Sequence, residues 1–123
     1  MTSEFFFPSV GGIENHIYSI SQCLIKLGHK VTVLTQERPS KGAYGIRYIS
    51  PGIKVYHIPC HFMKFGVIFP AITGGPLQVL FRDILIREKI DIIHIHASSS
   101  VLGIFISLFA RFMKIPVVWT LHR

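Results

Sequence analysis

Apolar residues near the start of the chain recur at the spacing of a helix. Between Ile13 and Leu27 they fall at every third or fourth position, which places them on one helical face. Gly28 follows directly, and glycine readily adopts the left-handed conformation that ends many helices. The pattern therefore predicts one amphipathic helix over residues 13–27.

Short apolar runs of strand type come next. Residues 30–35 are mostly apolar and β-branched, as in a strand buried on both faces of a parallel sheet. Residues 46–49 and 53–58 flank a Ser-Pro-Gly turn at 50–52 and predict two further short strands.

The second half of the chain continues the alternation. A helix is predicted over residues 76–89, because Pro76 suits a first helical position and the apolar residues form one stripe. Residues 91–96 and 116–121 predict strands, and residues 101–113 predict a serine-capped, mostly buried helix. The charged residues expected on the outer face of the 76–89 helix are Arg82, Asp83, Arg87, Glu88 and Lys89.

Strands that alternate with helices predict an α/β fold with a doubly wound parallel sheet. Ligands of such a sheet bind outside the carboxyl ends of its strands. Only residues 1–7 precede the first loop, so the first strand is expected to be truncated. A length of 123 residues suits one domain and leaves no room for a second.

Composition and charge narrow the functional classes. Half of the residues are hydrophobic and 15% are charged, which is typical of a well-buried globular domain. Thirteen Lys and Arg against six Asp and Glu give a formal charge of +7, which favours phosphates, nucleic acid or an anionic membrane face. The basic residues are scattered and match no nucleic-acid-binding module, so nucleic acid is not an expected partner.

Cysteine use and hydropathy bear on the compartment. Cys23 and Cys60 lie far apart without metal-ligand spacing, and both are expected to be reduced thiols in the core. The start of the chain lacks the layout of a secretory signal, and no apolar run reaches the roughly 20 residues that span a bilayer. The chain is therefore expected to face the cytosol.

Gly11 and Gly12 stand directly before the first predicted helix. The absence of side chains lets a ligand approach the backbone, and a helix amino terminus offers free N–H groups to a phosphate. The pair matches neither GxGxxG nor a Walker loop, and a simple turn explains it as well.

Three histidines fall at strand ends. His94 and His96 alternate along one predicted strand, so their side chains point to the same side, and His122 follows the last strand. His96 is nearer the ligand-binding edge; both a packed structural role and a substrate-facing role remain open for it. No metal site is expected, because no third ligand stands at a convincing spacing.

An apolar stretch with an embedded cation precedes the 76–89 helix. It could lie against lipid acyl chains with phosphates nearby, although a buried loop and a core helix explain it nearly as well. The residues expected to face lipid under the first interpretation are Phe62, Lys64, Phe65, Phe69, Arg82 and Arg87.

Several segments together resemble the PIG-A family of retaining GT-B glycosyltransferases. They are FFFPSVGGIENHIYSISQCL at 5–24, LGHKV at 27–31, GIRYISPGIKVYHIP at 45–59, IREKIDIIHIHASS at 86–99 and TLH at 120–122. A glycine pair before a helix is common to many GT-B transferases, whereas the GIRY and KVYHIP segments are more particular to PIG-A. The resemblance covers most of the chain.

The resemblance implies a Rossmann-like, acceptor-side domain over residues 1–123, with the donor-binding C-terminal domain absent. It implies transfer of N-acetylglucosamine from UDP-N-acetylglucosamine to phosphatidylinositol in glycosylphosphatidylinositol (GPI) anchor synthesis. The expected place is the cytosolic face of the endoplasmic reticulum membrane, together with other subunits of the transferase complex. Neither a metal ion nor another cofactor is expected, and the chain alone is expected to be inactive.

The resemblance also assigns residues. Gly11 and Gly12 would lie against the donor diphosphate, His16 would face the cleft, and His96 and His122 would line the sugar or acceptor side. Two alternatives stay open: a non-catalytic remnant that binds lipid or another protein of the complex, and a transferase of the same fold that uses another lipid acceptor.

Overall fold

A computed structural model describes residues 1–3, 5–6, 11–37, 45–49, 52–62, 68–70, 75–96 and 100–122. Strands and helices alternate along most of these residues, as the sequence predicted. In chain order the elements are β1 (Thr2–Ser3), α1 (Gly12–Lys26), β2 (Thr32–Glu37), β3 (Gly45–Ile49), β4 (Ile53–Phe62), β5 (Ile68–Pro70), α2 (Gly75–Arg87), β6 (Ile93–His96), α3 (Val101–Met113) and β7 (Val117–Thr120).

The sheet confirms the doubly wound α/β fold. Its strand order is β3-β4-β2-β1-β6-β7, and the pairs β4-β2, β2-β1, β1-β6 and β6-β7 are parallel. Strand β3 runs antiparallel to β4, and β5 adds a further antiparallel pair at the far end of β4. From β1 the chain winds outward to β2 on one side and later to β6 on the other. The switch point between β1 and β6 is where such folds bind ligands.

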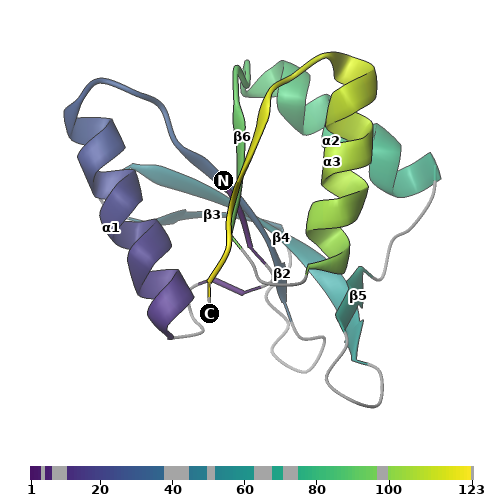
Figure 1. Cartoon of the computed structure of the whole chain (residues 1–123), viewed down its shortest axis with the longest axis horizontal. Helices are drawn as coiled ribbons and strands as arrows, with labels where there is room; N and C mark the ends of the chain where they lie inside the picture. Colours follow the sequence, from purple (N-terminus) through teal and green to yellow (C-terminus); the bar gives the residue numbers. More distant parts are fainter. Residues whose placement is uncertain are drawn as a thin grey trace.

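Helices cover both faces of the sheet. Figure 1 shows α1 on one side and α2 with α3 on the other. Alternate residues along β2 serve the two sides: Val33 packs in the cluster with Ile17 of α1, and Leu34 packs in the cluster with Phe81 of α2 and Ile106 of α3. This division explains why the inner strands are apolar on both faces.

The first helix begins and ends close to the predicted positions. Gly11 precedes it with extended backbone, and Gly28 follows it with a φ of 90°. Leu27 lies just after the helix and is exposed, so the predicted apolar face stops before it. Cys23, expected in the core, is also exposed, because its position on α1 points away from the sheet.

Strand bounds differ modestly from the prediction. Strand β2 begins two residues later than expected and continues to Glu37, because it stays paired with β4 as far as Pro59. The short β1 is a central strand, which agrees with the expected truncated first strand. Strand β5 was not predicted from the sequence.

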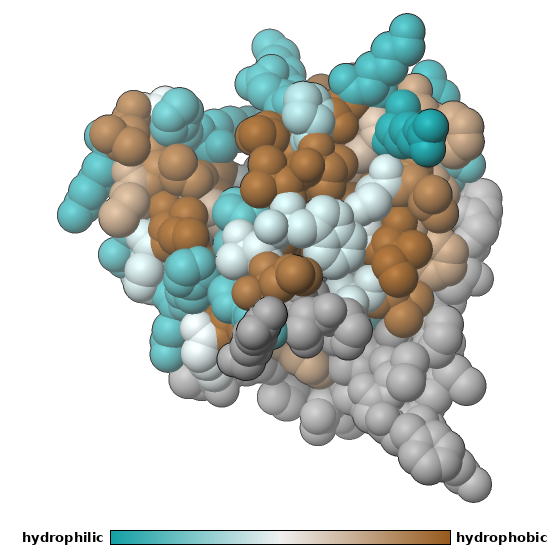
Figure 2. Space-filling model, in the orientation of Figure 1, coloured by the Kyte–Doolittle hydropathy of each residue, from teal (hydrophilic) through white to brown (hydrophobic). Residues whose placement is uncertain are grey.

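The expectation of a mostly buried helix at residues 101–113 is only half right. The Ser100 hydroxyl accepts a 2.9 Å hydrogen bond from the Gly103 N–H and caps α3 as predicted. One side of the helix packs on the sheet, but Ile104, Leu108 and Phe112 form an exposed stripe. Figure 2 shows apolar surface over β7 and α3. No helix in the described part of the chain has the length and hydropathy needed to cross a bilayer.

Candidate functional site

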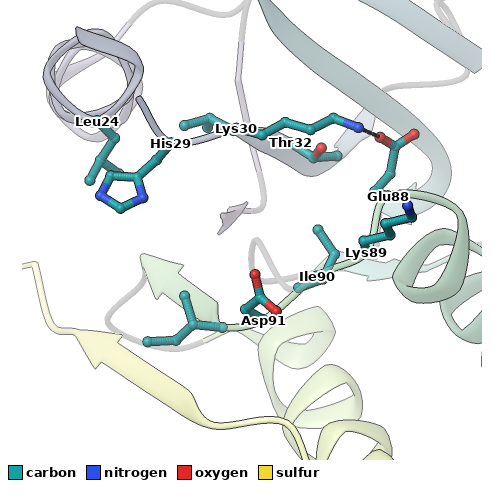
Figure 3. Close-up of a pocket in the computed structure, with 10 residues that line it drawn as sticks. Leu24, His29, Lys30, Thr32, Glu88, Lys89, Ile90 and Asp91 are labelled. Atoms are coloured by element: carbon teal, nitrogen blue, oxygen red, sulfur yellow. Dashed lines mark ion pairs between the residues drawn. The ribbon is translucent and has the colours of Figure 1, made fainter. Parts of the chain in front are cut away.

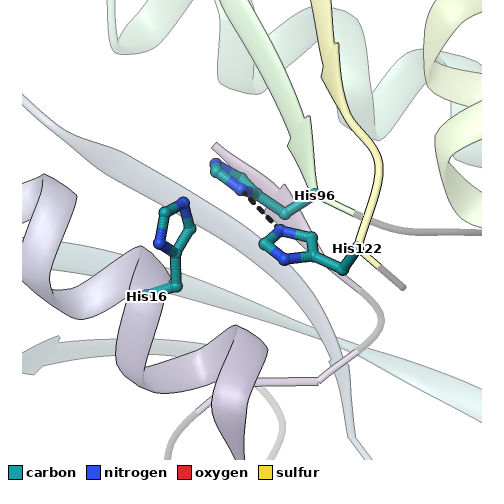
Figure 4. Close-up of side chains that lie close together, drawn as sticks. All are labelled: His16, His96 and His122. Carbon is teal, nitrogen blue, oxygen red and sulfur yellow. Dashed lines mark hydrogen bonds between the residues drawn. The ribbon is translucent and has the colours of Figure 1, made fainter.

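Histidines from three separate elements converge at the carboxyl edge of the sheet. His96 ends β6, His122 stands two residues after β7, and His16 lies on the second turn of α1. Figure 4 shows the three imidazoles turned toward one another from these elements. They meet beside the switch point between β1 and β6, where the fold predicts a ligand.

The distances within this histidine cluster are short. The Nδ1 atom of His96 lies 3.4 Å from the Nε2 atom of His122. The His16 ring stands edge-on to both, with centroid distances of 5.6 Å to His96 and 5.1 Å to His122. One ring nitrogen from each residue can be chosen so that all three lie within 4.8 Å of one another. A small ligand can therefore contact all three rings.

His94 supports the cluster from the same strand. Its ring lies 4.0 Å from the His96 ring, centroid to centroid, because the two residues alternate on β6. Its Nε2 atom is 2.6 Å from the Thr120 hydroxyl of β7. This contact ties β6 to β7 just before His122 and helps to place that residue.

Burial keeps the inner rings neutral at physiological pH. His96 has no exposed surface, and this burial lowers its pKa to about 3, with smaller contributions from His94 and His122. Burial also lowers the pKa of His94. The Nε2 atom of His96 is buried and has no hydrogen-bond partner among the described residues. The cluster thus presents neutral imidazole nitrogens whose bonding capacity is not used up by the protein.

The glycine pair lies at the amino end of α1, one turn before His16. No side chain caps this helix end among the described residues, so its first N–H groups are available to a ligand. A Cβ atom on Gly12 would meet no described atom within 4 Å, whereas one on Gly11 would come within 2.5 Å of the Glu14 carboxylate. Neither glycine has a positive φ. The backbone here does not itself require glycine at position 12.

The residues expected to face lipid are only partly tested by the structure. Arg82 and Arg87 are exposed on α2, as expected. Phe62 lies at the end of β4 and Phe69 within β5, and the two strands pair antiparallel. Residues 63–67, with Lys64 and Phe65, lie outside the described residues.

The largest cavity lies at the opposite edge of the sheet. It has a volume of about 530 Å³ and is lined by residues that precede β2 and β6, including Lys30 and Ile92. Figure 3 shows Lys30 reaching across it to Glu88. Because this is the amino edge of the parallel strands, it is not where the fold places a ligand.

Glu88 corrects one prediction from the sequence. It was expected on the outer face of its helix, but it lies just after α2 and is only 4% exposed. Its Oε1 atom accepts 2.5 Å hydrogen bonds from the Lys54 ammonium and the Tyr56 hydroxyl, and its Oε2 atom lies 3.1 Å from Lys30 Nζ. The helix ends at Arg87, which turns Glu88 inward.

These partners decide the charge of Glu88. Burial alone would raise the pKa of the carboxyl group, but the hydrogen bonds from Lys54, Tyr56 and Lys30 outweigh it and lower the pKa to about 2. Glu88 therefore remains ionised in the folded protein at neutral pH. We call Glu88 with these three partners the Glu88 corner; it is a satisfied structural site.

Sequence reasoning missed the meeting of the cluster. His16 stands 80 positions before His96 in the chain, so no local spacing predicts their contact. The signal that could have found it is topological: the first helix, β6 and β7 all meet at one edge in a doubly wound sheet.

Comparison with known proteins gives one consistent family. Residues 39–123 match the family model described as PIGA (GPI anchor biosynthesis). The first of the phosphatidylinositol N-acetylglucosaminyltransferase subunits, from Arabidopsis thaliana, is 44% identical over 122 residues, which are 99% of this chain and 26% of that protein. The gpi3 subunit of the same transferase from Schizosaccharomyces pombe is 43% identical, with the same coverage of 99% and 26%.

A more distant relative is alpha-monoglucosyldiacylglycerol synthase of Acholeplasma laidlawii. It is 31% identical over 128 residues, which cover 98% of this chain and 28% of that protein. The chain thus spans about a quarter of the length of the curated relatives that it matches.

Proposed function

The chain belongs to the PIGA family of GPI-anchor biosynthesis, and on that premise we propose that it forms the acceptor-side domain of a transferase for N-acetylglucosamine. The donor would be UDP-N-acetylglucosamine and the acceptor phosphatidylinositol. The reaction would need a second, donor-binding domain, because this chain corresponds to about a quarter of its relatives. Alone, the chain would bind without turnover.

One observation carries the proposal: the histidine cluster stands at the switch point of the sheet, one helical turn from the free amino end of α1. Neutral imidazoles and backbone N–H groups are suitable donors and acceptors for sugar hydroxyls and phosphate oxygens. His16, His96 and His122 come from elements that the fold itself brings to the ligand edge. A purely structural cluster would be expected to satisfy its own buried nitrogens.

In this proposal the residues have separate roles. The amino end of α1 at Gly11 and Gly12 receives the donor diphosphate, which must displace the nearby Glu14 carboxylate. His16 and His122, which are accessible, contact the sugar or the acceptor hydroxyl. His96 is fully buried and positions the other two rings.

The proposed setting is the cytosolic face of the endoplasmic reticulum membrane. Exposed Arg82 and Arg87 on α2 would approach the phosphates of anionic lipids, and the formal charge of +7 favours this surface. The S. pombe and A. thaliana relatives are named as subunits, so we include other subunits of a transferase complex among the partners.

The competing proposal is a binding module without chemistry. The exposed stripe of Ile104, Leu108 and Phe112 favours it, because such a stripe suits a protein or lipid contact independent of any reaction. A third possibility is another lipid acceptor, which the relationship to the A. laidlawii enzyme supports.

A chimera separates these proposals. The matching quarter of the S. pombe gpi3 subunit is replaced by this chain, and microsomes are assayed for transfer of labelled N-acetylglucosamine to phosphatidylinositol. We expect transfer above that of a strain without gpi3. A chimera that is folded and joins the complex but gives no labelled lipid would favour the binding module, and a different labelled lipid would favour another acceptor.

A further inference from the structure

The histidine cluster has the composition of a metal centre as well as of a sugar site. Three residues from α1, β6 and the end of β7 each offer one ring nitrogen, and these nitrogens lie within 4.8 Å of one another. No carboxylate or thiolate belongs to the set. Three imidazoles and an open position are a common ligand arrangement for zinc in proteins.

We propose that His16, His96 and His122 form a binding site for a divalent ion of the zinc class, separate from any requirement of sugar transfer. The sequence predicted no metal because it showed only the His94 and His96 pair and no third ligand at a suitable spacing. The fold supplies the missing ligands from α1 and from the end of β7.

The nitrogen distances support this site. Zinc holds imidazole nitrogens at about 2.0–2.1 Å in a tetrahedral arrangement, which places two such nitrogens about 3.3 Å apart. The 3.4 Å between His96 Nδ1 and His122 Nε2 agrees with that separation. The third nitrogen, from His16, has to approach by a further ångström or so. His16 is exposed on α1, so a rotation of its side chain can bring it in.

The hydrogen bonding of His96 points the same way. A contact of 3.4 Å is longer than the usual range for hydrogen bonds from nitrogen, so His96 Nδ1 is poorly satisfied. Its Nε2 atom has no partner among the described residues, although the ring is fully buried. Buried imidazoles normally use their nitrogens, and a bound ion would engage the nitrogen that faces His122.

The ligand set also predicts which ions bind. Neutral imidazoles favour zinc, cobalt, nickel and copper, whereas magnesium and calcium require oxygen ligands. Because His16 is exposed and His122 is half-buried, a fourth position at the ion remains accessible to water.

The test is a titration of the untagged protein with Zn²⁺ alone, followed by calorimetry and by thermal unfolding. We expect one equivalent to bind and to raise the melting temperature, and Mg²⁺ to do neither. Co²⁺ should give the visible absorption of a four-coordinate site. His16→Gln and His122→Gln should each weaken Zn²⁺ binding at least tenfold.

The matched control is His29→Gln, because His29 is an exposed histidine beyond the other end of α1. It should leave Zn²⁺ affinity unchanged. His16→Gln changes an exposed helical position, so the fold should persist and the test does not depend on a buried substitution. Binding that survives both His16→Gln and His122→Gln, or no binding at tens of micromolar Zn²⁺, would overturn the proposal. Neither readout measures sugar transfer, so failure here leaves the proposed function untouched.

Discussion

The two edges of the sheet bury polar groups in opposite ways. At the amino edge, the Glu88 carboxylate is surrounded by donors from Lys30, Lys54 and Tyr56, and both of its oxygens are used. At the carboxyl edge, His96 is equally buried, yet its nitrogens have at most one long contact. A buried group that is fully paired stabilises the fold, whereas one that is left unpaired marks a place for a ligand.

Cavity size alone would have chosen the wrong edge. The hollow of about 530 Å³ lies beside Glu88, where the carboxylate has no capacity left for a ligand. The histidine cluster is more modest in volume but stands at the switch point of the strand order. Topology and unsatisfied nitrogens are the better guides in this molecule.

Removing the carboxylate of the Glu88 corner should have the largest effect. Glu88→Ala leaves Lys54 and Tyr56 without their shared acceptor, and we expect the free energy of unfolding to fall by about 3 kcal/mol. Urea denaturation at pH 7 measures it, with Asp83→Ala on the exposed face of α2 as the control. A loss below about 1 kcal/mol would mean that the corner is not a structural site.

Acid should reveal the histidine edge before the Glu88 corner. His96 has a pKa of about 3 in the folded protein against an ordinary 6.5, so below pH 6.5 the unfolded chain binds a proton that the folded protein does not. Stability should therefore fall by about 2 kcal/mol between pH 6.5 and 5. His94 adds to the fall, since its pKa is also lowered.

The Glu88 contribution follows the opposite kind of group and a lower window. Its pKa is lowered from 4.5 to about 2, so its stabilisation is complete above pH 4.5 and is lost as the pH falls toward 2. Urea denaturation across pH 7 to 4.5, in buffer with a chelator, isolates the histidines. His96→Gln should flatten the slope there; an unchanged slope would show that His96 is not the titrating group.

Gly12→Val in the chimera tests the amino end of α1. The new side chain stands where a diphosphate would approach, so donor affinity should fall at least tenfold, about 1.4 kcal/mol. The melting temperature should change little, because Gly12 has no positive φ and a Cβ there meets no described atom. Loss of stability in proportion to activity, or unchanged donor affinity, would remove Gly12 from the donor site.

The smallest effect is expected at the membrane-facing cations. Arg82→Ala with Arg87→Ala should weaken binding to vesicles containing anionic lipid by a few-fold, and the difference should shrink as salt rises. Vesicle sedimentation measures it, with Lys26→Ala on α1 as a control of equal charge type. Equal binding to neutral and anionic vesicles would contradict an electrostatic role.

Local patterns predicted the elements well because each helix and strand is specified by its own residues. The spacing at 13–27 and the Ser100 cap are examples, since both depend on neighbours within one or two turns. Glu88 was misplaced because its burial depends on Lys54 and Tyr56, which are more than 30 positions away in the chain. The exposed side of α3 was missed because an apolar helix does not tell which of its faces meets the sheet.

The candidate site was predicted residue by residue but not as a cluster. The resemblance assigned His16, His96 and His122 separately, and the strand order brings them to one point. The contribution of His94 was not foreseen, because it depends on a contact with Thr120 across β6 and β7.

The central claim is that the histidine edge, and not the larger cavity, serves the ligand. The direct measurement is the rate of N-acetylglucosamine transfer by the chimera carrying His16→Ala, compared with the unsubstituted chimera and with the His29→Ala variant. Because His16 and His29 are both exposed, neither change should lower the melting temperature appreciably. We predict at least a tenfold fall in transfer for His16→Ala and none for His29→Ala; equal rates for all three proteins would contradict the account.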